Sequence, residues 1–426
     1  MSCTGIQAAL EVLAAHGVRY LFGNPGTTEL PLNDALVGDA RFQYILGLQE
    51  VPVMAMADGY AMASGDIGFV NLHISCGLGN AMGMLYNAFR EGTPLVVTAG
   101  QQDRRLVFEE PILWGQMVEV ARPWTKWSYE VQRVQDLPGA LRRAVQTALT
   151  PPTGPVFLSL PVDVQTELAE GLDLSPPQLH DTRVRPPADA LRRAAQLLAQ
   201  AQRPAILAGS RVTERDAVME LVRVAELLGA PVMHESGTTH GRLAFPPDHP
   251  LAALGLPLWS PEVRARLEPH DVVLVVGMDL LRQYIYYEPA AAVPPGVKLV
   301  HLDESPRELG KNYAVEVGLI GDTKAGLHEL ADELATAQSN DDRAAAARRL
   351  AHYKAQHDAA RDALRQTITA QQADRPMTPL TFMNAIAEAL PPSAAVIEEA
   401  VTTTNTTLER LGALKNTSGY FGHRGW

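Results

Sequence analysis

The stretch FGNPGTTEL at residues 22–30 decides the fold, together with YILGLQE at residues 44–50 and NLHISCGLGN at residues 71–80. Each stretch is an apolar run that passes directly into a polar turn. Short apolar runs between helical patterns are typical of buried strands in a parallel sheet. Residues just beyond the carboxyl ends of such strands line the crevice where open α/β sheets bind ligands, so we expect the three turns to meet at one site.

Strands alternate with helices along most of the chain. In the first part the apolar runs predict strands at residues 18–23, 42–46, 68–73, 95–99 and 156–160. A second set of strands is predicted at residues 205–208, 231–234, 272–277 and 298–302. A charged helix over 343–371 and a helix capped at Thr378 follow. We therefore predict an α/β chain of successive doubly wound parallel-sheet domains: an N-terminal domain at 1–180, a central Rossmann-like domain at 181–345, and a connecting helix with the start of a third domain at 346–426.

Composition excludes several classes of function. The formal net charge of -12 argues against partners such as nucleic acid or an anionic membrane, which need a basic surface. Cys3 and Cys76 are too few for a disulfide framework or a zinc cluster, and the first residues lack the pattern of a signal peptide, so we expect a cytoplasmic protein. No apolar run approaches the roughly 18 to 20 residues that span a bilayer.

Three polar elements are candidates for chemistry, each with a structural alternative, and a fourth element is a glycine turn. Glu50 opens a helix, so it is either an acid favoured by the helix dipole or a buried carboxyl that shares a proton with a heteroaromatic ring nitrogen. His73 ends a strand, where it is either a core histidine or a catalytic one. Residues 77–80, GLGN, are predicted to form a tight turn before the next helix. Residues 402–404 are either an ordinary helix cap or a seat for a diphosphate.

In their order along the chain and in their amino-acid sequences, these segments resemble the thiamine-diphosphate-dependent 2-oxo acid decarboxylase and acetolactate synthase family. The resemblance is strongest to its benzoylformate decarboxylases. The likeness is carried by GNPGTTELP (23–31), LQE (48–50), ADGYA (57–61), NLH (71–73), GLGNAMG (77–83), TAGQQ (98–102) and KWS (126–128). It covers nearly the whole chain and is strongest before residue 165. The resemblance implies a pyrimidine-binding first domain, a diphosphate-binding third domain, thiamine diphosphate with Mg²⁺, a 2-oxo acid substrate, and a homodimer or homotetramer with active sites between subunits.

The resemblance also implies roles for individual residues. Glu50 matches the glutamate that activates the cofactor, His73 an active-site histidine that handles protons, and Thr27 a hydroxyl near the substrate carboxylate. The implied cofactor contacts are Pro25, Gly26, Asn80, Thr402, Thr403 and the Gly425 carbonyl, and the implied substrate contacts are His423, Arg424 and Tyr284.

Two departures from the family pattern limit what it implies. The stretch LRQYIYYEP at residues 281–289 lacks the histidine that benzoylformate decarboxylases carry in this loop, so benzoylformate is not assigned as the substrate. The chain also stops at Trp426, before any G-D-G segment with a downstream asparagine, so no metal ligand is assigned. We expect a chain shortened within its third domain and inactive by itself.

Other functions stay open at this point. One is a non-catalytic dimerising or binding protein that keeps the pyrimidine-domain fold. A nucleotide-binding oxidoreductase is disfavoured because Ala208-Gly209-Ser210 is not a G-x-G-x-x-G turn. FAD in the central domain is possible but has no motif to support it, and decarboxylation and carboligation are not distinguished.

Overall fold

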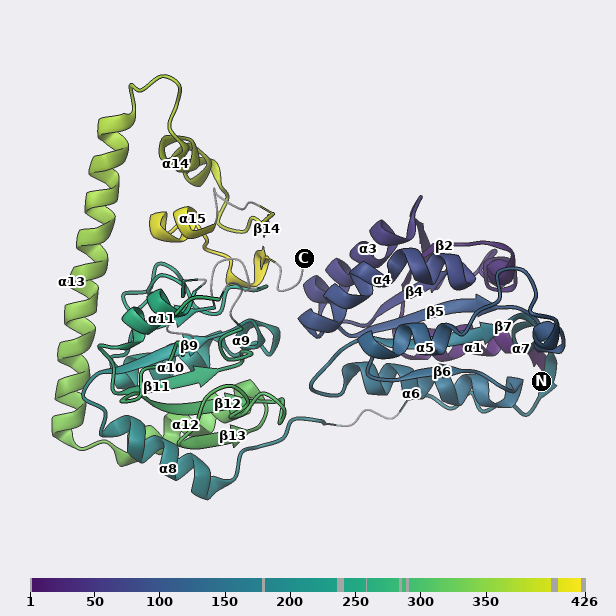
Figure 1. The fold of residues 1–426 in the computed structure, drawn as a ribbon, viewed down its shortest axis with the longest axis horizontal. Coiled ribbons are helices and arrows are strands. Elements are labelled where there is room, and N and C mark those ends of the chain that lie inside the picture. Colours follow the sequence, from purple (N-terminus) through teal and green to yellow (C-terminus); the bar gives the residue numbers. More distant parts are fainter. Residues whose placement is uncertain are drawn as a thin grey trace. The chain divides into compact units, whose positions relative to one another are not determined.

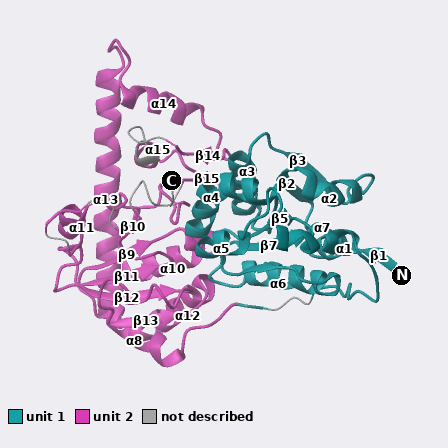
Figure 2. Ribbon diagram, turned by 45° about the vertical axis from the view of Figure 1, so that its right-hand side comes forward, with its two compact units in different colours: residues 1–182, 425–426 teal, residues 183–424 magenta. Residues whose placement is uncertain are grey.

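The computed structural model describes residues 2–177, 181–235, 241–257, 259–282, 286–288, 291–399 and 405–422. They form two compact units, one ending at Thr182 and the other beginning at Arg183 (Figure 2). Each unit contains a parallel sheet with helices on both faces (Figure 1). The prediction of successive doubly wound α/β domains is confirmed by these two sheets.

The first unit is built on a six-stranded sheet in the order β3-β2-β4-β5-β7-β6. Its strands are β2 (Tyr20–Asn24), β3 (Gln43–Leu46), β4 (Gly68–Leu72), β5 (Leu95–Gln101), β6 (Ser128–Glu130) and β7 (Val156–Pro161). Its helices are α1 (Gly5–Ala15), α2 (Leu30–Ala35), α3 (Glu50–Ser64), α4 (Ile74–Glu91), α5 (Met117–Ala121), α6 (Leu137–Leu149) and α7 (Val162–Thr166). A small antiparallel pair joins β1 (Ser2–Thr4) to β8 (Leu168–Glu170).

Alternate residues of each strand supply the two hydrophobic cores of this unit. Leu21, Phe69 and Val96 belong to the core that contains α1 and α6. Their chain neighbours Phe22, Val70 and Val97 belong to the core that contains α3, α4 and α5. Successive side chains of a strand point to opposite faces, so strands covered on both sides are apolar throughout. This is why the sequence shows continuous apolar runs rather than an alternating pattern.

The second unit repeats this architecture with a five-stranded sheet in the order β10-β9-β11-β12-β13. Its strands are β9 (Pro204–Ala208), β10 (Val232–His234), β11 (Val272–Val276), β12 (Lys298–Asp303) and β13 (Val317–Ile320). Its helices are α8 (Ala188–Ala199), α9 (Arg211–Glu214), α10 (Val218–Leu228), α11 (Ser260–Leu267) and α12 (Thr323–Ala337). Beyond them lie α13 (Asn340–Gln371), α14 (Pro379–Ala389), α15 (Asn405–Leu411) and the parallel pair β14 (Val396–Ile397) and β15 (Tyr420–Phe421).

Helix α13 is 32 residues long and buries only Ala346 and Leu364, which confirms the predicted solvent-facing connecting helix. Thr378 caps α14 as expected, because its side chain accepts a hydrogen bond from the amide of Thr381. The described residues contain no helix that is both long enough and apolar enough to cross a membrane.

The predicted tight turn at residues 77–80 is wrong. Helix α4 already begins at Ile74, so the glycines lie within its first two turns. Neither Gly77 nor Gly79 has a positive φ, and a Cβ would make only ordinary contacts of 3.4 Å at Gly77 and none within 4 Å at Gly79. Glycine marks a turn where the backbone needs a positive φ, and these two positions do not need one.

Asp58 on α3 carries a pH-dependent cost to stability. It is 7% exposed, its Oδ1 has no hydrogen-bond partner among the described residues, and burial raises its pKa from 3.8 to about 6. A carboxyl whose pKa is raised on folding stabilises the folded state at low pH, and that contribution is lost as the pH rises from about 4 to about 6. Above that range the folded chain holds a poorly paired buried charge.

We therefore expect Asp58→Asn to stabilise the chain at pH 8 by on the order of 2 kcal/mol, since one pKa unit corresponds to about 1.4 kcal/mol. The gain should shrink towards zero near pH 4, where both side chains are neutral. Thermal unfolding at both pH values measures it, with the exposed Asp66→Asn as the control. An equal effect of Asp58→Asn at both pH values would contradict this assignment.

Candidate functional site

The strand order predicts a ligand-binding crevice between β2 and β4. The chain leaves β2 towards α2, which packs with α1 on one face of the sheet, and leaves β4 towards α4, which packs with α3 on the other face. Neighbouring strands whose connections leave to opposite faces form a topological switch point, and open α/β sheets bind ligands there. The predicted segments at residues 24–29 and at His73 follow these two strands.

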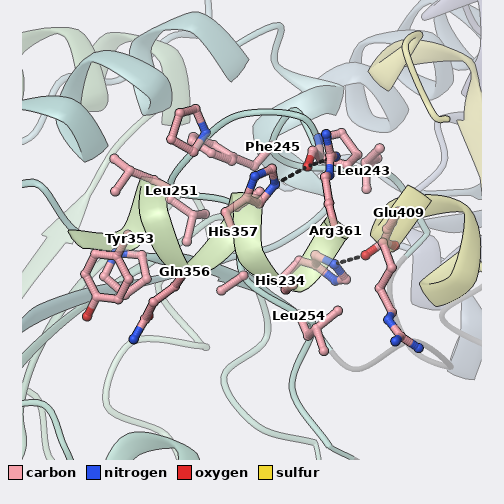
Figure 3. A pocket seen from close by; sticks show the side chains of 18 of the residues that line it. His234, Leu243, Phe245, Leu251, Leu254, Tyr353, Gln356, His357, Arg361 and Glu409 are labelled. Atoms are coloured by element: carbon pink, nitrogen blue, oxygen red, sulfur yellow. Dashed lines mark hydrogen bonds and ion pairs between the residues drawn. The ribbon is translucent and has the colours of Figure 1, made fainter. Parts of the chain in front are cut away.

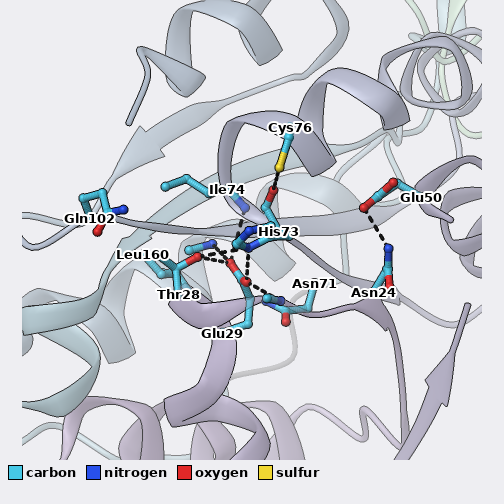
Figure 4. Close-up of polar contacts among 12 residues, drawn as sticks. Asn24, Thr28, Glu29, Glu50, Asn71, His73, Ile74, Cys76, Gln102 and Leu160 are labelled. Atoms are coloured by element: carbon cyan, nitrogen blue, oxygen red, sulfur yellow. Dashed lines mark hydrogen bonds and ion pairs between the residues drawn. The ribbon is translucent and has the colours of Figure 1, made fainter. Parts of the chain in front are cut away.

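Glu50 lies at the first position of α3, beside this crevice, and is 5% exposed. Its Oε1 accepts a hydrogen bond of 2.9 Å from Nδ2 of Asn24, which ends β2. Its Oε2 accepts a second one, also of 2.9 Å, from Nδ2 of Asn80 on α4 (Figure 4 shows the Asn24 contact). An ionised carboxylate can accept about four hydrogen bonds, so the two amides orient the group and leave acceptor positions for a ligand.

Glu29 is the most heavily hydrogen-bonded carboxylate of the site, and it is 1% exposed. Its Oε2 accepts from the amide of Gly26 at 2.9 Å and from Nδ1 of His73 at 2.8 Å. Its Oε1 accepts from Oγ1 of Thr28 at 2.7 Å and from the amides of Ile74 at 3.3 Å and Gly100 at 2.8 Å (Figure 4). The side chain of Glu29 therefore connects, through hydrogen bonds, the turn after β2, the turn after β4 and the end of β5.

Two glycines make room for this arrangement. A Cβ on Gly100 would lie 2.3 Å from Oε1 of Glu29, and a Cβ on Gly26 would lie 2.1 Å from Nδ1 of His73. Ile74 donates to Glu29 from a positive φ of 38°, which is rare for a β-branched residue. Strained backbone of this kind persists only where the surroundings hold it, and it is concentrated at functional sites.

The Glu29 contact determines the proton position on His73. A carboxylate only accepts hydrogen bonds, so Nδ1 of His73 must be the donor. In the neutral ring Nε2 then carries no proton and can accept one. The side chain of His73 is 20% exposed, whereas that of Glu29 is fully buried. The ring is thus held from one side and stays accessible on the other.

Sequence reasoning missed the role of Glu29, which it treated only as part of the GNPGTTELP stretch. A signal was present, since Glu29 stands three residues after Gly26, the spacing at which a side chain reaches back to the amide that opens a helical turn. Thr28 is the adjacent residue, but the donors of His73, Ile74 and Gly100 lie 44, 45 and 71 positions further along the chain, and no local pattern connects them to Glu29.

The remaining predicted residues differ in where they lie. Asn80 contacts Glu50 from within α4, not from a turn. Pro25 and Gly26 lie in the turn after β2 and are partly exposed. Thr27 is exposed, while its neighbour Thr28 is the buried hydroxyl, 2% exposed and 3.5 Å from Nδ1 of His73.

Six predicted contacts cannot be placed. Tyr284, Thr402, Thr403, His423, Arg424 and Gly425 lie outside the described residues. Within the described ranges, no group of three or more His, Cys, Asp or Glu side chains is arranged to hold a metal ion.

Comparison with known proteins relates this site to one family. The family description "Thiamine pyrophosphate enzyme, N-terminal TPP binding domain" matches residues 3–115, and the central-domain description of the same family matches residues 191–330. The X-ray structure of a thiamin diphosphate-dependent enzyme from Mycobacterium smegmatis aligns with all of this chain and 78% of that protein, with 31% sequence identity and a TM-score of 0.84. The chain belongs to the thiamine-pyrophosphate enzyme family.

Relatives within this family differ in activity. Benzoylformate decarboxylase from Pseudomonas aeruginosa is 36% identical over 330 residues, which are 77% of this chain and 61% of that protein. The acetolactate synthase large subunit from Buchnera aphidicola is 27% identical over 340 residues, which are 77% of this chain and 57% of that protein. The chain therefore spans less than two thirds of the length of either relative.

The pyrimidine side of a thiamine-pyrophosphate site can be tested against the described residues. An aminopyrimidine ring presents nitrogen atoms that pair with a carboxylate and with backbone groups. Glu50 is such a carboxylate: it is buried, oriented by two amides, and has acceptor positions left over. The residues present therefore fit the pyrimidine half of the cofactor, while the residues predicted for the diphosphate half lie outside the described ranges.

Proposed function

We propose that this protein catalyses the decarboxylation or carboligation of a 2-oxo acid with thiamine diphosphate and Mg²⁺. The observation that carries the proposal is the Glu50 carboxylate, clamped by Asn24 and Asn80 at the crevice of the first sheet. When bound, thiamine diphosphate supplies the electron sink that carbon dioxide loss from a 2-oxo acid requires. The relatives named above, a decarboxylase and a synthase, support both reaction types.

Glu50 has the role of a proton-sharing group in this proposal. Its carboxylate would hold a proton with a ring nitrogen of the aminopyrimidine, which is general acid/base chemistry. Asn24 and Asn80 approach the two oxygens from β2 and α4, so the carboxylate cannot rotate away without breaking both hydrogen bonds. Proton transfer depends on hydrogen-bond geometry, so a group that shares a proton must be held in a fixed orientation. The contacts from β2 and α4 hold the Glu50 carboxylate in this way.

His73 has the role of a proton carrier on the substrate side. Glu29 fixes its tautomer, and Nε2 is the nitrogen left to accept and return a proton. Thr27, exposed beside the buried Thr28, is proposed to contact the substrate carboxylate. Pro25 and Gly26 are proposed to flank the cofactor ring, and Thr402, Thr403 and Gly425 to contact the rest of the cofactor. His423, Arg424 and Tyr284 are proposed substrate contacts.

The proposal includes a homo-oligomer with sites between subunits. Large apolar side chains are exposed after β3 and β5: Leu48 is 91% exposed, Phe108 98% and Ile112 83%. All three follow the carboxyl ends of strands of this sheet, so they are candidates for an interface with a partner subunit. Leu48 is two residues from Glu50, so a partner that covered it would also close the site.

Flavin is not part of the proposal. At the corresponding switch point of the second sheet, after β9 and β11, the guanidinium of Arg211 lies 2.7 Å from Asp279 and 2.9 Å from Asp303. All three side chains are buried. These groups are already paired with one another, so the described residues add no support for a flavin at this position.

The test is an assay of 2-oxo acid consumption and carbon dioxide release with thiamine diphosphate and Mg²⁺, run on this chain and on a protein of full family length. Pyruvate, branched-chain and aromatic 2-oxo acids form the panel. We expect cofactor-dependent turnover of at least one of them. A protein that dimerises without cofactor, binds no thiamine diphosphate and consumes none of the acids would instead be the non-catalytic dimerising alternative.

A further inference from the structure

A cavity of about 310 Å³ lies in the second unit, whereas the site described above belongs to the first. It is lined by the end of β10, the segment 243–254, the middle of α13 and the helix α15 (Figure 3). Most of its wall is apolar, with Val232, Leu243, Phe245, Leu251 and Leu364 among the lining side chains. A cavity of this size and polarity can take a small organic molecule.

Arg361 brings a positive charge into this apolar wall. Its Nη2 donates to the carbonyl oxygen of Pro247 at 3.1 Å, but its Nε is buried and has no hydrogen-bond partner among the described residues. No carboxylate of the described chain lies within ion-pair distance of Arg361, and Asp248, the nearest acid in sequence to Pro247, pairs with Lys415 at 2.7 Å. Burial lowers the pKa of Arg361, and the attraction of the Asp248 carboxylate offsets this only in part.

Other arginines of this unit have a partner for their Nε–H. Arg211 and Arg215 donate from Nε to the carboxylates of Asp303 and Glu304. Arg242 and Arg349 donate from Nε to the backbone carbonyl oxygens of Tyr420 and Leu228. Leaving a buried polar group without a hydrogen bond costs free energy, so folded proteins generally pair such groups. Arg361 differs from these four arginines because its Nε has no partner among the described residues.

The one acid in the cavity wall is already paired. Glu409 on α15 accepts from Nε2 of His234 at 2.7 Å, and both side chains are buried. Arg410 lines the cavity from an exposed position and adds a second positive charge. His357, one turn before Arg361 on α13, contacts the same Pro247 carbonyl at 3.3 Å. The cavity therefore combines apolar walls with an excess of positive charge.

We propose that this cavity binds a small carboxylic acid with an apolar body. The carboxylate would pair with the guanidinium of Arg361, a charge-assisted hydrogen bond, and the body would pack among Phe245, Leu251 and Leu364. Such a ligand would contact the second sheet, α13 and α15 at once. Binding would then stabilise the second unit by mass action, whether or not the first site is active.

The experiment is calorimetric titration of the chain with phenylacetate and with 4-methylpentanoate, beside the neutral phenylacetamide. We expect at least one of the two acids to bind and to raise the unfolding temperature, and the amide to bind at least about tenfold more weakly. Arg361→Gln should weaken acid binding by at least about tenfold. The matched control is Arg365→Gln one turn further along α13, where the exposed side chain pairs with Asp362, and it should leave binding unchanged.

A second variant keeps the test decisive if Arg361→Gln does not fold. Ala360→Phe adds bulk at an exposed helix position that lines the cavity, so it should fold and exclude the acid. The proposal is overturned if neither acid binds at millimolar concentration, if the amide binds as tightly as the acid, or if binding survives both Arg361→Gln and Ala360→Phe. The last result would place the acid at another site, such as the crevice of the first unit.

Discussion

Glu50→Gln is expected to lower the rate of 2-oxo acid turnover by about 100- to 10,000-fold, the range over which a positioned proton-transfer group contributes. Glutamine keeps the shape of the side chain but cannot share a proton as a carboxylate does. Its amide nitrogen would also face Nδ2 of Asn24 or Asn80, because both of those atoms now donate to Glu50. The loss should appear in kcat, measured by carbon dioxide release at saturating thiamine diphosphate.

The control for this prediction is Glu167→Gln, an exposed glutamate of the same unit. It should leave kcat unchanged. Asn80→Ala tests the orienting contact separately: removing one of two donors should reduce kcat less than Glu50→Gln does, since Asn24 still holds the carboxylate. A Glu50→Gln enzyme that turns over within a few-fold of the unmodified one would refute the proposed role of this carboxylate.

Glu29→Ala is expected to destabilise the first unit by about 3–5 kcal/mol, because each buried donor left without its acceptor costs at least about 1 kcal/mol. Five donors lose their acceptor at once, among them the amides of Gly26, Ile74 and Gly100. Backbone amides left buried without a partner carry the full cost of desolvation. Thermal and urea unfolding measure the loss, with Glu167→Ala as the surface control.

Glu29→Gln separates this structural effect from an effect on His73. Glutamine can accept from some of the five donors through its oxygen, so most of the fold should be retained. The ring of His73 loses the carboxylate that determines its tautomer, so the pH profile of turnover should change even where the folded fraction is unchanged. An unaltered pH profile in a folded Glu29→Gln protein would mean that Glu29 has a structural role alone.

The buried strands were largely predictable because the residues within each strand carry the signal. A strand that is covered by helices on both faces is apolar at nearly every position, and this appears in the sequence as a continuous apolar run such as Gly68–Leu72 or Val272–Val276. The short strands β6 and β13 were not predicted. Ser128–Glu130 is a polar edge strand, and Val317–Ile320 alternates buried and exposed residues. Such segments become strands only through the neighbour with which they pair.

The sequence by itself determined the kind of chain and the doubly wound domains, because alternating helices and continuous apolar runs are typical of parallel sheets covered on both faces, and it predicted a site beyond the carboxyl ends of the strands. It also named Glu50 and His73 as candidate site residues. Only the tertiary structure decided that Glu29 connects the turns, that Thr28 rather than Thr27 is buried beside His73, and that Arg361 enters an apolar cavity. These contacts join residues up to 114 positions apart, and local periodicity carries no information about which distant side chains meet.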